Sequence, residues 1–284
     1  NFATKALYGV DKDGVTSVSG NVTTGVYTAN GGVYVIGSVP KGGTLQMDGK
    51  SNLVWCTEAD KNKFKVLGGT IETYPKEVLD AYVASMIRHV STEAATIAGE
   101  KNCYDVDSIV INGQSFQNNK TIDITGCGAG TYYFDMTPYA QDGINDLKIK
   151  KHANQTIVFN YPTSTSVTLK RFSLEQDGKS ISSATSDATV DMLCRSIIFN
   201  MPAATSVHFA SATAGLFLAP NAKVESLGGT SSGWIVVDDF TNNGGEWHCV
   251  YGELPKPEEI HKPTEESFQV SKTVDGQTPT ENQK

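Results

Sequence analysis

The chain has 284 residues, and 31 acidic against 23 basic side chains give it a formal net charge of −8. Nucleic-acid-binding proteins and polybasic membrane-surface proteins both need a basic face, so this balance argues against both classes. No run approaches the roughly 18 apolar residues that a transmembrane helix needs, so this segment is predicted not to span a membrane.

Short strands are predicted along most of the chain. Each candidate is rich in Val, Ile, Thr or aromatic residues and is bounded by Gly, Asn, Asp or Pro. The candidates are 33–36, 44–47, 53–55, 108–111, 121–124, 131–134, 147–149, 156–159, 166–169, 195–199, 206–209, 215–218, 234–237 and 246–250. Their spacing of about 8–12 residues is typical of an all-β sandwich, barrel or solenoid.

Residues 76–98 break the strand pattern. Apolar residues recur there at steps of three and four, which predicts a helix with one apolar stripe. The stripe consists of Leu79, Val83, Met86, Val90, Ala94 and Ile97. Pro75 fits the first turn, and Gly99 lies where a C-capping glycine is expected. Such a helix would be about 35 Å long, which matches a stack of roughly seven strands.

An internal repeat supports the stacking of strands. The segment TIVFNYPTSTSVTL at 156–169 returns as SIIFNMPAATSVHF at 196–209, a separation of 40 residues. The pairs that recur include Ile157/Ile197, Phe159/Phe199 and Asn160/Asn200. This predicts one or two coils of a β-solenoid, in which the Ile and Phe pairs stack inward and the Asn pair forms a ladder at a corner. Two similar hairpins in a sandwich are the alternative, and the repeated corner residues favour the solenoid.

The composition changes after Tyr251. Residues 255–267 are rich in Pro and Glu, which predicts an extended polar linker. Residues 268–274 have a strand pattern, but too few residues follow them for an independent fold. We therefore predict a head domain over 1–254, a linker over 255–267 and the truncated start of another domain over 268–284. Because the chain opens at Asn1, we interpret it as a mature segment.

Several segments of the head resemble the choice-of-anchor A domain of bacterial surface proteins. GLFLAPNAKVE at 215–225, GWIVV at 233–237 and GEWH at 245–248 resemble the close of that domain. GTYYFDM at 130–136 and TIVFNYP at 156–162 resemble its central strands. The resemblance covers about residues 8–254. It implies a β-solenoid with a helix alongside, at the head of a secreted, cell-wall-anchored adhesin, often from a Gram-positive bacterium.

The tail FQVSKTVDGQTPTENQK at 268–284 is similar to the opening strand of streptococcal-type pilin isopeptide-linkage domains. The resemblance implies that Lys272 is the lysine of an isopeptide bond whose Asn lies beyond residue 284. Together the two resemblances imply a surface stalk that continues into further domains of the same polypeptide.

Acidic residues and histidines give no strong catalytic or metal-binding pattern. Glu246 and His248 fall on one face of a strand, and a hydrogen-bonded pair is their simplest interpretation. Asp238 and Asp239 could be the paired carboxylates of a glycosidase, but turn or edge positions explain them equally well. The five histidines show no ligand spacing, so no metal site and no cofactor are predicted.

Lys148, Lys150 and Lys151 form the densest basic run, which we interpret as a solvated sheet edge. A β-helix enzyme that acts on polysaccharides would need such basic residues close to acids, so this run keeps that alternative open.

Threonines raise the hypothesis of ice binding, which would need a flat and regular threonine array. The repeat keeps Thr165 as Thr205, but Thr163 and Thr168 are replaced by Ala203 and His208. The array is broken, so ice binding is not predicted.

The five cysteines are an odd number, so at least one thiol is unpaired. We predict a Cys103–Cys127 disulfide and a Cys194–Cys249 disulfide, which leave Cys56 free. Spacing alone does not settle these pairings, because geometry decides which cysteines can be bridged.

The sequence as a whole predicts a mainly β protein, a β-solenoid with one long helix over 76–98. The predicted function is a non-enzymatic adhesin head that binds a host protein, a matrix protein or a glycan at the bacterial cell surface. Exposed Tyr and Trp side chains would be natural contact points, since aromatic residues anchor interfaces. A polysaccharide-acting β-helix enzyme and a ligand-free spacer are the alternatives.

Overall fold

The computed structural model describes residues 2–6, 33–40, 45–47, 53–66, 69–100, 103–105, 120–181, 187–226, 230–242 and 246–248. Internal contacts divide the chain into two units, Asn1–Gly252 and Glu253–Lys284. All described residues belong to the first unit. The predicted strand 108–111, the linker 255–267 and the tail with Lys272 lie outside the described residues.

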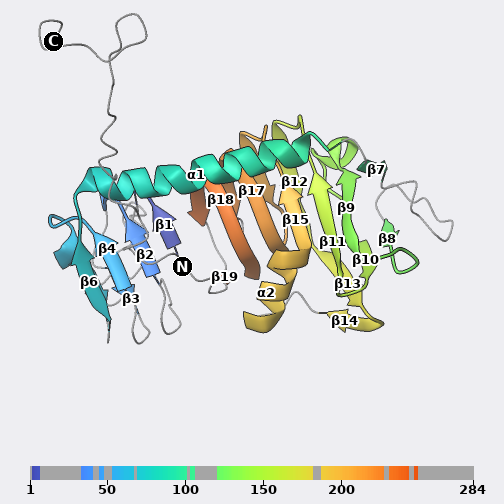
Figure 1. Cartoon of the computed structure of the whole chain (residues 1–284), viewed down its shortest axis with the longest axis horizontal. Helices are drawn as coiled ribbons and strands as arrows, with labels where there is room; N and C mark the ends of the chain where they lie inside the picture. Colours follow the sequence, from blue (N-terminus) through green and yellow to red (C-terminus); the bar gives the residue numbers. More distant parts are fainter. Residues whose placement is uncertain are drawn as a thin grey trace, which may run out of the picture. The chain divides into compact units, whose positions relative to one another are not determined.

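The first part of the chain forms two small sheets of parallel strands (Figure 1). One sheet has the order β1-β2-β4-β6, and the other pairs β3 with β5. The bounds are β1 Phe2–Thr4, β2 Val33–Ile36, β3 Leu45–Met47, β4 Leu53–Cys56, β5 Phe64–Val66 and β6 Thr70–Thr73, with a short 3-10 helix η1 at Lys61–Lys63. These strands bury a core of Tyr34, Ile36, Val39, Val54, Cys56 and Phe64.

Helix α1 spans Lys76–Ala98, which confirms the predicted helix and its limits. Its buried residues are Leu79, Tyr82, Val83 and Ala94. The helix contacts β1, β2 and β4 of the first part and also β15 and β17 of the second part, so it connects the two. At its end Gly99 has a φ of −77°, a right-handed conformation, so the left-handed C-cap expected from the glycine is not used.

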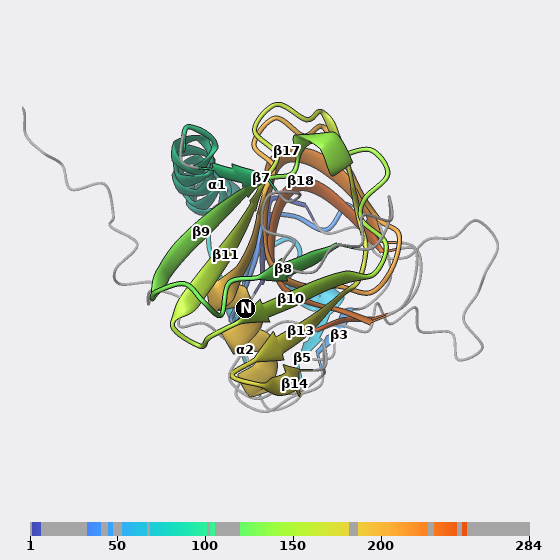
Figure 2. The same cartoon turned by 90° about the vertical axis from the view of Figure 1, so that its right-hand side faces the viewer.

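The second part is dominated by one sheet of nine strands that curls (Figure 2). Its strands are β7 Cys103–Asp105, β9 Gly130–Asp135, β11 Gln155–Asn160, β12 Ser166–Leu169, β15 Ile197–Asn200, β16 Ser206–Phe209, β17 Ala214–Ser226, β18 Thr230–Asn242 and β19 Glu246–His248. All the pairs in it are parallel. The first half of β17 pairs with β15 and its second half with β16, so the sheet turns a corner within one strand.

A smaller sheet stands opposite the curled one (Figure 2). It has the order β14-β13-β10-β8, and only its β13–β14 pair is antiparallel. The bounds are β8 Thr121–Asp123, β10 Leu147–Lys151, β13 Phe172–Gln176 and β14 Lys179–Ile181, and a 3-10 helix η3 lies at Thr137–Tyr139. The two sheets enclose one apolar core, in which Ile122, Ile149 and Leu174 face Phe159, Phe199 and Phe217 across the interior.

The internal repeat stacks in register. In the β11–β15 pair, Ile157 lies opposite Ile197, Phe159 opposite Phe199 and Asn160 opposite Asn200. The Asn ladder is therefore confirmed, and the hairpin alternative is wrong because the two segments pair directly and in parallel. One repeat corresponds to one step from strand to strand along the stack.

The Asn ladder also holds α1 in place. Asn200 Nδ2 donates to Asn160 Oδ1 at 2.9 Å and to the Ala94 carbonyl at 3.0 Å, and Asn160 Nδ2 donates to the Ile97 carbonyl at 3.2 Å. Both Asn side chains are buried. The ladder stops at Asn200, because Leu218 takes the next register position on β17.

A second helix, α2 at Asp187–Ser196, was not predicted. Its last residues fall in the predicted strand 195–199, which begins only at Ile197. The helix contacts β11, β15, β17 and β18 and buries Val190, Leu193 and Cys194. Of the helices in the described ranges, none has both the length and the apolar character needed to cross a membrane.

Along α1 the strands do not follow their order in the sequence. In Figure 1 the row runs β6, β4, β2, β1 and then β18, β17, β15, β11 and β9. The chain thus builds outward to β6, returns along α1 and builds back toward β1. Over the described residues the fold is mainly β with two α-helices, and the curled parallel sheet is compatible with a β-helix-like arrangement.

Candidate functional site

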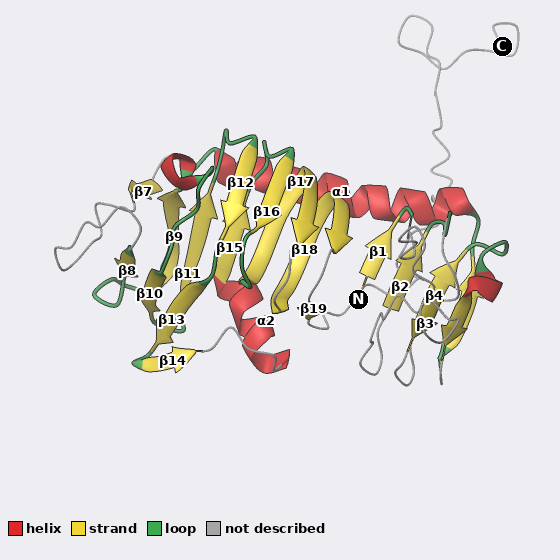
Figure 3. Ribbon diagram, turned by 180° about the vertical axis from the view of Figure 1, so that it is seen from behind, coloured by secondary structure: helices red, strands yellow, loops and turns green. Residues whose placement is uncertain are grey.

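One face of the curled sheet points outward and carries polar side chains. We call it the exposed face; it consists of Ser166, Thr168, Ser206, His208, Lys223, Glu225, Asp239 and Thr241. Ser166 of β12 lies opposite Ser206 of β16, and Ser206 lies opposite Lys223 of β17. Most of these side chains are exposed, and Thr168 and His208 are half-buried. In Figure 3 these strands are seen on the side away from α1.

Strand alternation explains this arrangement. The residues between the outward ones face the core, where Val167, Val207 and Val224 form one buried row across three strands. The neighbouring row adds Leu169 and Phe209. The corner before the face is also fixed, because Thr205 donates to the Thr165 carbonyl through its backbone N–H at 2.8 Å and through its hydroxyl at 3.2 Å. The exposed face is therefore rigidly supported.

The exposed face changes in character along the stack. Its β12 and β16 part presents hydroxyls and one imidazole, while its β17 and β18 part adds Lys223, Glu225 and Asp239. Strands in a sheet are about 4.8 Å apart, so these hydrogen-bonding groups repeat at that interval. Such a surface can bind an extended polar ligand through many weak hydrogen bonds.

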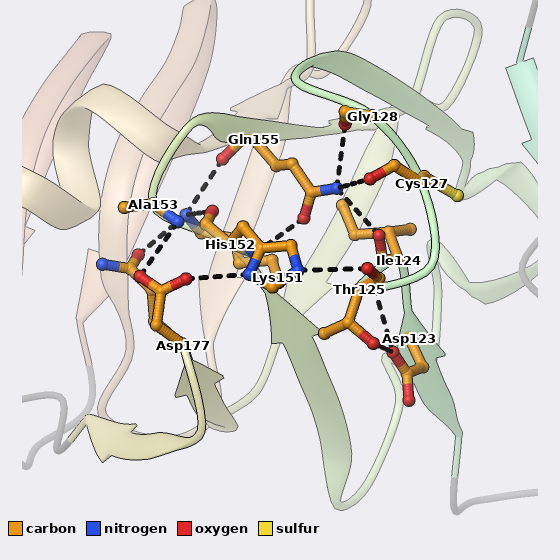
Figure 4. A network of polar contacts seen from close by, with 11 residues as sticks. Asp123, Ile124, Thr125, Cys127, Gly128, Lys151, His152, Ala153, Gln155 and Asp177 are labelled. Carbon is orange, nitrogen blue, oxygen red and sulfur yellow. Dashed lines mark hydrogen bonds and ion pairs between the residues drawn. The ribbon is translucent and has the colours of Figure 1, made fainter.

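A second polar cluster lies where three turns meet, and we call it the His152 corner (Figure 4). The turns are Ile124–Gly128 after β8, His152–Asn154 after β10 and Asp177–Gly178 after β13. Gln155 is fully buried, and its Nε2 lies 2.8–3.0 Å from the carbonyls of Ile124, Cys127 and Gly128. One amide group thus holds the whole first turn against β11.

Lys151 is buried in this corner with no exposed surface. Its Nζ donates to the Gln155 carbonyl at 2.9 Å, the His152 carbonyl at 3.1 Å and Gln176 Oε1 at 2.8 Å. Three acceptors match the three protons of an ammonium group. Burial lowers the pKa of Lys151 to about 8, although the nearby charge of Asp177 raises it.

The interpretation of the basic run as a solvated edge is wrong for Lys151. Lys148 and Lys150 point outward, but Lys151 follows the inward-facing Leu147 and Ile149. Alternation along the strand is the signal that could have found it, since Lys151 takes the next inward position after Leu147 and Ile149. Lys150 Nζ lies 3.9 Å from Glu175 Oε2 on the outer surface of the next strand.

His152 occupies the solvent side of the corner. Its Nδ1 lies 2.8 Å from Asp177 Oδ1, and its Nε2 lies 3.0 Å from the carbonyl oxygen of Thr125. The Asp177 carboxylate, and after it the Thr125 carbonyl, raise the pKa of His152 above its ordinary value. The hydrogen bond from His152 in turn lowers the pKa of Asp177. These contacts make the cluster a joint between turns.

A cleft of about 740 Å³ lies at the other end of α1, where the strands β2, β4 and β6 end. It is lined by residues 37–38, 57–60 and 73–76. Asp60 is buried beside it and accepts hydrogen bonds from Thr57 Oγ1 and the Val39 N–H. Burial raises the pKa of Asp60, but hydrogen bonds from Lys63, Thr57 and Val39 outweigh this and lower it. Asp60 therefore fixes the loop that borders the cleft.

Comparison with known families decides the class of the chain. Residues 1–249 match the family described as "Putative Ice-binding-like adhesive domain". The chain belongs to this family. Searches of curated proteins and of solved structures found no match. The family supports an adhesive role at the cell surface.

The tryptophans of the adhesive domain are not among its exposed side chains. Trp55 is buried, and Trp234 and Trp247 are half-buried. Trp247 packs edge-on against Phe209 and Phe217. Its ring therefore closes the core at this end of the stack. Tyr104, at 45% exposure, is the exposed tyrosine among the described residues.

The structure describes the side chains of three cysteines of the adhesive domain and shows no disulfide among these three. Cys127 is exposed, while Cys56 and Cys194 are buried. Cys194 Sγ donates to the Gly215 carbonyl at 3.3 Å. The side chain of Cys103 and all of Cys249 lie outside the described residues, so the bridges Cys103–Cys127 and Cys194–Cys249 remain predictions.

The other predicted candidates do not assemble into a catalytic or metal site within the described part of the chain. Asp238 and Asp239 are exposed neighbours on β18, at the point where its register with β17 shifts, and Asp239 lies opposite Lys223. The side chains of Glu246 and His248 lie outside the described residues. Over the described ranges, no three His, Cys, Asp or Glu side chains group as metal ligands would.

Proposed function

We propose that the domain is the non-enzymatic head of a bacterial surface adhesin and that it binds its ligand through the exposed face. Membership of the adhesive family supports the surface role. The observation that carries the choice of face is the row of outward Ser, Thr and charged side chains over a fully buried apolar row. A rigid surface loses little conformational entropy on binding, so many weak contacts can add up.

The architecture behind this proposal is a β-solenoid built from two half-stacks, with α1 as their common spine. Support comes from the parallel in-register pairing and from the contacts of α1 with both parts. The resemblance of residues 8–254 to the choice-of-anchor A domain fits such a head. The similarity of 268–284 to a pilin domain, with Lys272 as its isopeptide lysine, leads us to propose a wall-anchored stalk beyond this chain.

The ligand class proposed is a host protein, a matrix protein or a glycan. The test is binding of the purified chain to an array of glycans and matrix proteins, with product analysis of every glycan that binds. Saturable binding without product supports the adhesin. Cleaved glycan would favour the polysaccharide-acting enzyme. An absence of binding to every member of the array would favour the spacer.

A pair of matched variants tests the face itself. Ser206→Arg places a bulky charge at the centre of the exposed face, where the parent side chain is exposed. Ser173→Arg makes the same change at an exposed serine of β13, on the outer surface of the other sheet. We expect Ser206→Arg to weaken binding at least about tenfold, the range for disrupting a central interface position. Equal losses in both variants would reject the exposed face as the binding surface.

A further inference from the structure

The two contacts of His152 fix its protonation state. A carboxylate and a backbone carbonyl both only accept hydrogen bonds, so each ring nitrogen must donate. Nδ1 donates to Asp177 Oδ1 at 2.8 Å and Nε2 to the Thr125 carbonyl at 3.0 Å. A neutral imidazole has one N–H and can satisfy only one of them. The geometry of the corner is therefore that of an imidazolium ion.

The imidazolium connects two turns that are far apart in the sequence. Thr125 belongs to the turn after β8, and Asp177 to the turn after β13, while His152 follows the strand β10 between them. Asp177 also accepts the Ala153 N–H at 3.3 Å, which ties the carboxylate to the His152 turn (Figure 4). The ring thus spans three successive strands of the smaller sheet.

The other charged and titratable groups around the ring are few. Lys151 of β10 is buried beneath it, and its charge and that of Asp177 act on each other. On the side of β8, Asp123 accepts hydrogen bonds from the Thr125 N–H and hydroxyl, and Cys127 is an exposed thiol of the same turn. Asp177 is the only one of these acids bonded to the ring.

We propose that His152 is a pH-operated clasp that ties the Ile124–Gly128 turn to the Asp177 turn when protonated and releases it when neutral. The charge-assisted bond to the carboxylate is the stronger one, so neutral His152 keeps its proton on Nδ1. The Nε2 lone pair then faces the Thr125 carbonyl oxygen, and this contact becomes repulsive. Gln155 still holds the other carbonyls of the turn, so the release is confined to the neighbourhood of Thr125.

The direction of the pH effect follows from the raised pKa of His152. The clasp is complete below the ordinary histidine pKa of 6.5, and it is lost as the pH rises through the higher pKa of the folded protein. Lys151 loses its charge near pH 8, so it remains an ammonium ion through the start of this window. The domain would hold its corner most firmly in mildly acidic surroundings.

The test is an NMR titration of the histidine ring protons in the full chain, with His152→Gln assigning the signal. We expect His152 to titrate above 6.5 in the parent and lower in Asp177→Asn. Asn suits position 177 because its φ is 51°, a conformation that Asn tolerates. Glu175→Gln alters an acid on the outer surface of β13, the strand that precedes Asp177. It should leave the titration of His152 unchanged.

Hydrogen exchange supplies a second readout. We expect the protection of amides in the 124–128 turn against exchange to fall about two- to fivefold as His152 loses its proton, the range for one exposed ion pair. The amide of Cys127 is the first to follow. The fall should be absent in His152→Gln. An ordinary pKa for His152, an unchanged pKa in Asp177→Asn, or the same exchange pH dependence in parent and His152→Gln would each overturn the clasp.

Discussion

Two polar clusters hold this domain together, and they differ in kind. The Asn160–Asn200 ladder is neutral and buried, and it fixes α1 to the curled sheet. The His152 corner contains a buried ammonium group, an imidazolium and a carboxylate, and it fixes the turns of the smaller sheet. Buried amide groups can therefore hold an element in place at any pH, whereas ionised groups do so only while they keep their charge. Variants at each cluster test this contrast.

The largest effect is expected at the Asn ladder. Asn200→Ala removes two hydrogen bonds and leaves a cavity in a fully buried site, which should lower the free energy of unfolding by about 3 kcal/mol. Urea unfolding measures it. The loss should be the same at pH 6 and pH 8, because neither Asn titrates. A pH-dependent loss would remove the distinction between the clusters.

Lys151 should give a comparable effect that depends on pH. Its folded pKa of about 8 lies below the value of 10.5 for an exposed lysine, so the unfolded chain holds more protons between these values. The free energy of unfolding should therefore rise with pH across that interval, by up to about 3 kcal/mol.

Lys151→Met provides the control for this rise. Other groups titrate in the same range, so the quantity to compare is the difference between parent and variant at each pH. We expect this difference to change in favour of the parent from pH 8 to 10.5. A constant difference would show that Lys151 is not desolvated.

The effect of His152 on global stability should be smaller and of opposite sign. His152 is half-exposed, so its contribution is screened by solvent. Relative to His152→Gln, the parent should lose stability as the pH rises above about 6.5, with a shift in the melting temperature of about 1–2 °C. Thermal unfolding at pH 6 and pH 8 measures it. If the melting temperature of the parent exceeded that of His152→Gln by more at pH 8 than at pH 6, the clasp would be contradicted.

Thiol reactivity compares the exposed His152 corner with the buried interior without a change in stability. Cys127 in the His152 corner is exposed, whereas Cys194, which bonds the carbonyl of Gly215 beside the helix-covered strands, is buried. An unbridged Cys127 would react with a thiol reagent at once in the folded protein, and we expect Cys194 to react only after denaturation. If Cys127 reacts only after reduction, the predicted Cys103–Cys127 bridge exists.

The sequence predicted one of the two clusters and missed the other. The repeat aligns Asn160 with Asn200, and identical residues at one strand position stack when the strands pair in register. The His152 corner has no repeat behind it. Lys151, Gln155 and Asp177 come together because three different turns end at the same edge, and only the pairing of β8, β10 and β13 determines that.

Local patterns determined several elements of this protein. The three- and four-residue spacing of apolar side chains determined α1, and the alternation along each strand determined which residues face the core. The short helix α2 was missed, since its ten residues lead directly into the strong strand pattern that begins at Ile197. The tertiary structure alone decided the order of the strands along α1, the burial of Lys151 and the uncovered state of the exposed face. These depend on which segments meet across long stretches of chain, and periodicity within one segment carries no information about its distant partners.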